Sequence, residues 1–107
     1  MNIKEVVYNK LIRDKIPEIM EAKGLEFTTH IAINEEYEEM LYKKIYEEVL
    51  EFKENKSIEE MADLFEVVYA ICDLYKIDLD KLENVRIKKR DERGAFKERI
   101  ILKKVYE

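Results

Sequence analysis

The chain of 107 residues has little of what disulfide-rich or membrane proteins depend on. It has one cysteine, one proline, two glycines and no tryptophan. A single cysteine cannot form a disulfide within the chain. No apolar run is long enough for a transmembrane helix or a signal segment. We therefore expect a soluble protein of a reducing compartment, the cytoplasm, with no membrane partner.

Charge of neither sign is scarce. The sequence has 25 acidic and 20 basic side chains, and its net charge is −5. Binders of polymeric nucleic acid usually show a net positive surface, so this balance argues against such a partner. It leaves room for a phosphate-bearing partner if divalent cations mediate the contact. The length predicts one domain, residues 1–107.

Most of the chain has helical patterning. Pro17 suits a first helical turn and predicts a short helix to about Lys23, with Gly24 as its stop. Three longer helices are expected, one after a cap by Asn34 over 35–53, one from Ser57 to about 76, and one over 79–93. In the second of these, Ser57 and Glu60 match a capping box.

Two segments favour extended structure instead. Residues 27–33 are rich in β-branched side chains and predict a strand, with which the tail 99–106 could pair. The predicted fold class is mainly α, with an antiparallel helical hairpin, a third helix and a small β element. The helix 57–76 is apolar over most of its surface, so we expect two hairpins to pair into a four-helix bundle in a homodimer or higher homo-oligomer.

Acidic pairs mark the two helices of the hairpin. Glu60 and Asp63 stand at i, i+3, so their carboxylates emerge side by side. Glu48 and Glu51 have the same spacing in the preceding helix. Because a short break makes the two helices antiparallel, both pairs could converge across the hairpin.

Four facing carboxylates would repel one another unless a cation lay between them. Mg²⁺ prefers oxygen ligands and keeps waters that phosphate oxygens can replace. The spacing also has a plainer interpretation. Glu-x-x-Glu recurs by chance in so acidic a chain, for example at Glu35 and Glu38, and acids on a helix usually face solvent.

The order of the motifs carries a family resemblance. The segment from Tyr8 to Ile19 (YNKLIRDKIPEI) resembles the N-terminal signature of predicted house-cleaning nucleotide pyrophosphatases, a branch of the MazG-like all-α NTP pyrophosphohydrolase superfamily. Residues 44–51 (KIYEEVLE) resemble the first acidic motif of that superfamily, and 59–63 (EEMAD) resemble the second. Residues 93–96 (RGAF) are similar to an Arg-Gly-Gly-Phe segment, with Ala95 in place of a glycine.

The resemblance implies a site and a reaction. Mg²⁺ would be held by Glu48, Glu51, Glu60 and Asp63. A nucleoside triphosphate, one of non-standard structure, would be hydrolysed to the monophosphate and pyrophosphate, with Glu48 or Glu47 assisting proton transfer. We expect substrate contacts from a further set of charged residues: Lys10, Arg13, Lys15, Lys44, Glu66, Arg90 and Arg93.

Two other functions stay open on the sequence. A related branch of the superfamily hydrolyses phosphoribosyl-ATP, and the motifs do not exclude that substrate. A non-enzymatic helical interaction module is the third possibility, in which the acids form a solvated face.

Overall fold

The computed structural model describes residues 4–106. All the regular secondary structure in this part of the chain is helical. The four helices are α1 (Ile16–Ala22), α2 (Asn34–Asn55), α3 (Ile58–Leu74) and α4 (Leu79–Arg93). The prediction of a mainly α protein is thereby confirmed. The predicted cap by Asn34 is wrong, because Asn34 is the first residue of α2 and Ile33 is at the cap position, where no side chain makes a capping hydrogen bond.

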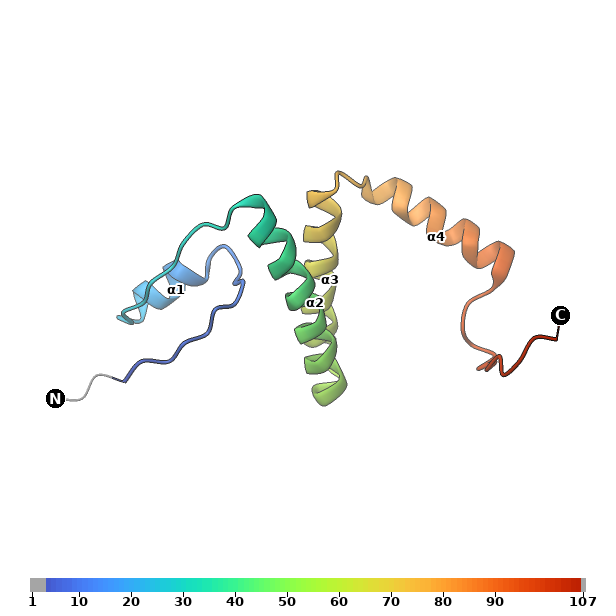
Figure 1. The fold of residues 1–107 in the computed structure, drawn as a ribbon, viewed down its shortest axis with the longest axis horizontal. Coiled ribbons are helices and arrows are strands. Elements are labelled where there is room, and N and C mark those ends of the chain that lie inside the picture. The colour runs from blue at the N-terminus through green and yellow to red at the C-terminus, as the bar shows by residue number, and fades with distance from the viewer. Residues whose placement is uncertain (1–3, 107) are drawn as a thin grey trace.

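The small β element is not supported. Residues 27–33 and 99–106 have no regular secondary structure, and the described chain contains no β-strand. Figure 1 shows the reason, since the first segment lies near the N-terminal end of the molecule and the second near the C-terminal end. β-branched composition favours extended backbone, but a ladder forms only where a partner strand is adjacent.

Helices α2 and α3 form the hairpin that organises the protein, and they pack along one another over their length (Figure 1). Lys56 ends α2 in the left-handed conformation, with a φ of 52°, and its N–H donates to the Phe52 carbonyl. Ser57 then caps α3, because its hydroxyl accepts a hydrogen bond of 3.2 Å from the Glu60 N–H. The predicted start of α3 is confirmed, and a two-residue turn reverses the chain.

The core lies between these two helices. Its fully or nearly buried apolar side chains are Leu41, Val67 and Cys72, so the cysteine packs as a small apolar residue. At the open end of the hairpin the Tyr42 and Tyr75 hydroxyls are hydrogen-bonded at 2.6 Å. This bond joins α2 to the residue that follows α3.

The remaining helices do not close over the hairpin. Asp78 caps α4 by accepting from the N–H groups of Asp80 and Lys81, and α4 then leads away from α3 (Figure 1). The molecule measures 69 × 30 × 29 Å and its radius of gyration is 19.2 Å. A compact domain of this length has a radius of gyration of about 13 Å. In the described part of the chain, no helix has the length and apolarity needed to cross a membrane.

Candidate metal centre

Three carboxylates from the two hairpin helices converge at one place. Glu48 comes from α2, and Glu60 and Asp63 come from α3. One oxygen of each side chain lies within 4.8 Å of one oxygen of the other two. The i, i+3 spacing on α3 and the antiparallel turn at Lys56 account for this approach. We call these three residues the acidic cluster.

Glu48 is the buried member of the acidic cluster, with 8% of its surface exposed. Burial raises the pKa of its carboxyl above the ordinary value, and the nearby Asp63 carboxylate raises it further. Lys44, whose ammonium lies 3.5 Å from Glu48 Oε1, opposes that rise in pKa. Desolvation thus makes this carboxylate costly to keep ionised unless positive charge is near it.

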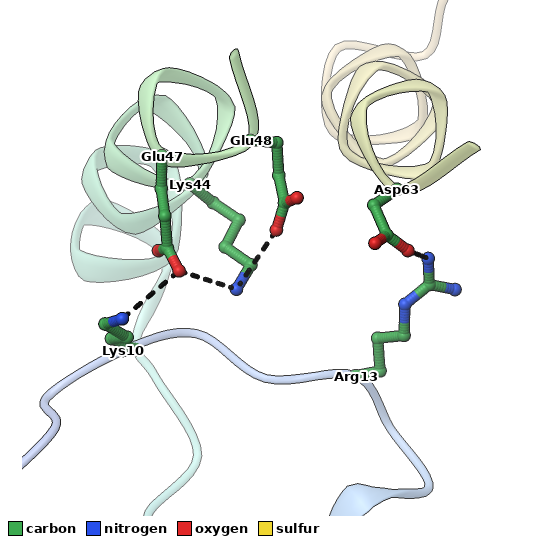
Figure 2. A network of polar contacts seen from close by, with 6 residues as sticks. All are labelled: Lys10, Arg13, Lys44, Glu47, Glu48 and Asp63. Carbon is green, nitrogen blue, oxygen red and sulfur yellow. Dashed lines mark hydrogen bonds and ion pairs between the residues drawn. The ribbon is translucent and has the colours of Figure 1, made fainter. Parts of the chain in front are cut away.

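Basic side chains approach the acidic cluster from two directions (Figure 2). Lys44 lies on α2 and reaches Glu47 at 3.6 Å as well as Glu48. The N-terminal segment runs across one side of the hairpin and brings two more cations (Figure 2). There Arg13 donates to Asp63 at 2.7 Å, and Lys10 donates to Glu47 at 3.2 Å. Three of the seven side chains predicted to contact substrate are therefore at the acidic cluster.

The Glu60 side chain is positioned by residues of the turn. Its Oε1 accepts a hydrogen bond of 3.1 Å from the Asn55 side-chain amide, while its backbone N–H donates to Ser57. The role of Asn55 was not predicted from the sequence. Its place at the last residue before the chain reversal is the signal that it would face the first turn of α3.

The other predicted site residues lie outside this arrangement. Glu51 is exposed, and the structure places it beside a shallow hollow with Leu50 and Glu54 instead of within the group of three acids. Glu66 and Lys15 are exposed on α3 and before α1. Arg90 and Arg93 are in the last turn of α4, which points away from the hairpin, so they are remote from the acidic cluster of their own chain (Figure 1).

The donor set suits a hard divalent cation. Carboxylate oxygens are ligands that Mg²⁺ accepts, and three of them leave further positions for water or phosphate oxygens. Burial and the Asp63 carboxylate both raise the Glu48 pKa, and a cation at the acidic cluster would offset both effects. The residues present therefore fit Mg²⁺.

Compared with protein-family models, with curated proteins and with solved structures, the chain matches none of them. What the protein does is accordingly inferred from its residues and their geometry.

Proposed function

We propose that the protein is a Mg²⁺-dependent pyrophosphohydrolase that converts a nucleoside triphosphate to the monophosphate and pyrophosphate. The observation that carries this proposal is the approach of Glu48, Glu60 and Asp63 within 4.8 Å of one another. These residues belong to the two acidic motifs in which the sequence resembles the MazG-like superfamily.

In this proposal the acidic cluster holds Mg²⁺, with Glu51 as a further ligand after a side-chain rearrangement. Bound Mg²⁺ would neutralise triphosphate charge and lower the pKa of a coordinated water. Glu47 lies next to the cluster, where Lys10 and Lys44 hold its side chain in place, and it is our candidate to take the proton of that water.

The basic side chains would bind the outer phosphates. Arg13 is suited to this role because a guanidinium forms paired hydrogen bonds with phosphate oxygens. It now donates to Asp63, and a phosphate that arrived with Mg²⁺ would take over that donor. Lys10 and Lys44 would neutralise the remaining charge. We propose a non-standard nucleotide as substrate and the cytoplasm as the location, and both follow from the resemblance and the composition.

We also propose that two hairpins pair into a four-helix bundle. An apolar stripe along α3 supports this, since Ile58, Phe65 and Tyr69 recur at helical spacing and are exposed in the single chain. Covering the stripe with a second hairpin would remove it from water. The single chain otherwise leaves a core of very few buried residues.

An interaction module without catalysis is the second candidate function. The observation that favours it is that Asp63 and Glu48 already have basic partners, Arg13 and Lys44, within the chain. In a module these pairs would be permanent and no cation would be needed.

Two measurements separate these functions. Purified protein is incubated with Mg²⁺ and a panel of standard and modified nucleoside triphosphates, and with phosphoribosyl-ATP, and pyrophosphate release is followed. We expect turnover of at least one triphosphate, and its loss in Glu48→Gln and Asp63→Asn. Glu59→Gln, an exposed acid of the same helix outside the acidic cluster, is the matched control and should keep full activity.

Calorimetric titration with Mg²⁺ alone is the second measurement. A saturable heat that disappears in Asp63→Asn supports the metal site. Folded protein that releases no pyrophosphate and shows no saturable heat would leave the interaction module as the better description. Turnover of phosphoribosyl-ATP alone would assign the protein to the related branch.

A further inference from the structure

The C-terminal segment, residues 95–106, is apolar and basic and is exposed along its whole length; we call it the C-terminal arm. Phe96 is 96% exposed, Tyr106 89% and Ile100 83%. The arm curls around a hollow of about 560 Å³ that its own residues and those at the end of α4 line. Helix α4 leads away from the hairpin, and the arm follows it at the C-terminal end of the molecule (Figure 1).

The single chain exposes much more surface than a compact folded monomer of the same mass. A folded monomer of 13.0 kDa exposes roughly 6,300 Å². This chain exposes 10808 Å². The excess is roughly 4,500 Å² for each chain. Large permanent interfaces bury about 2,000 to 5,000 Å² counted over both partners, which is at most about 2,500 Å² of each chain. A second copy could therefore cover up to about half of the excess.

Acidic and basic side chains are unevenly distributed between the hairpin and the residues that follow it. Residues 34–78, which form the hairpin, have fourteen acidic and five basic side chains, for a net charge of −9. Residues 79–106 have ten basic and five acidic side chains, for a net charge of +5. A basic, apolar segment thus projects from an acidic body. In a pair of copies, the basic segment of each copy could lie against the acidic hairpin of the other.

One surface of the hairpin matches the arm in both respects. Tyr46, Val49 and Leu50 are exposed on one side of α2, and Leu50 lines a shallow hollow with Glu51 and Glu54. We call Tyr46, Val49, Leu50 and Glu54 the α2 face. It offers apolar side chains to Phe96 and Ile101, and the Glu54 carboxylate to the lysines of the arm.

We propose that the C-terminal arm of one copy docks on the α2 face of a second copy. α4 acts as the spacer, because its 15 residues make a rod of about 22 Å that holds the arm clear of its own hairpin. A nucleic acid is a poorer occupant for the arm, since its apolar side chains would stay in water. The inference does not depend on the hydrolase proposal, because it rests on exposed area and charge alone.

Photo-crosslinking tests the contact directly. Full-length protein with p-benzoylphenylalanine in place of Phe96 is prepared in ¹⁴N and ¹⁵N forms, mixed, re-equilibrated, irradiated and digested. We expect crosslinks from the arm to peptides containing residues 46–54, and mixed isotope pairs among them. Crosslinks within one chain only, crosslinks between two arms, or crosslinks to residues 27–33 would each overturn the proposal.

Sedimentation equilibrium tests the energetic role of the arm. Ile101→Asp should weaken self-association roughly tenfold or more, because a carboxylate would be buried on the acidic α2 face. Asn84→Asp adds the same charge on the exposed surface of α4 and should leave association unchanged. Far-UV circular dichroism checks that both variants are folded. A wild-type mass of 13.0 kDa at all concentrations, or equal association of both variants, would overturn the proposal.

Discussion

The Arg13 guanidinium donates to the Asp63 carboxylate at 2.7 Å and so ties the N-terminal segment to α3. The two residues are fifty positions apart, and each belongs to a different motif of the sequence. Through this pair the N-terminal segment adds positive charge at the acidic cluster, beside that of Lys44 from α2.

Arg13→Ala should separate the role of this arginine in binding from its role in stability. Both partners are about half exposed, so the free energy of unfolding should fall by at most about 1 kcal/mol. The KM for a triphosphate should rise roughly tenfold through the lost phosphate contact. Arg86→Ala is the matched control, because Arg86 pairs with Glu83 on α4, away from the acidic cluster. A KM that rises equally in both variants would remove Arg13 from the substrate site.

Glu48→Gln should change how stability depends on pH. The folded-state pKa of Glu48 is raised, so the folded protein holds a proton that the unfolded chain has already lost. Stability is therefore lost as the pH rises from the ordinary carboxyl pKa through the raised one. The Glu48→Gln variant should lack this loss and be the more stable protein at pH 7 without Mg²⁺.

Thermal unfolding between pH 4 and pH 8 measures that difference. Glu39→Gln is the control, since Glu39 is an exposed acid of α2 that pairs with Lys43. Added Mg²⁺ should raise the melting temperature of the wild type more than that of Glu48→Gln. Parallel pH profiles for the wild type and Glu48→Gln would contradict the assigned cause.

Ser57→Ala should destabilise the hairpin through the loss of the α3 cap. The Ser57 hydroxyl accepts the Glu60 N–H, and removal of such a cap costs about 1 kcal/mol. Urea unfolding followed by circular dichroism measures the effect. Ser57→Asp keeps an acceptor at the cap and should unfold close to the wild type, whereas equal loss in both variants would show that the cap is unimportant.

Lys56→Gly should stabilise the protein. Lys56 has a φ of 52° in the left-handed region, which costs a residue with a side chain about 1 kcal/mol relative to glycine. A gain of roughly 0.5–1 kcal/mol is expected in the same urea experiment. Lys53→Gly, in the last turn of α2, should instead lose about 1 kcal/mol. A loss in both variants would indicate that the Lys56 side chain contributes contacts of its own.

Local rules were sufficient for the helices and insufficient for the extended segments. Ser57 and Gly94 mark helix ends by side-chain and backbone chemistry that acts within a few residues, and both boundaries were predicted. The strand at 27–33 was predicted from the same kind of local preference. Strand formation depends on a distant partner, and the tail 99–106 is at the other end of the molecule.

The acidic cluster was predictable only in part. The i, i+3 spacing and the short turn together brought Glu60 and Asp63 opposite Glu48. Glu51 has the right spacing as well, but it lines a hollow with Leu50 and Glu54 outside the acidic cluster. The Arg13 and Lys10 contacts depend on the path of the N-terminal segment, which no periodicity in the hairpin specifies.

The two-residue turn at Lys56 and Ser57 fixes which side of α3 faces α2. One residue inserted in the first turn of α3 would rotate Glu60 and Asp63 by about 100° around the helix axis relative to Ser57 and move them off the side that Glu48 faces. The approach of the three acids therefore depends on the number of residues between them as well as on their identity. A variant with one residue more or fewer between Glu48 and Glu60 would keep all three acids and lose their approach.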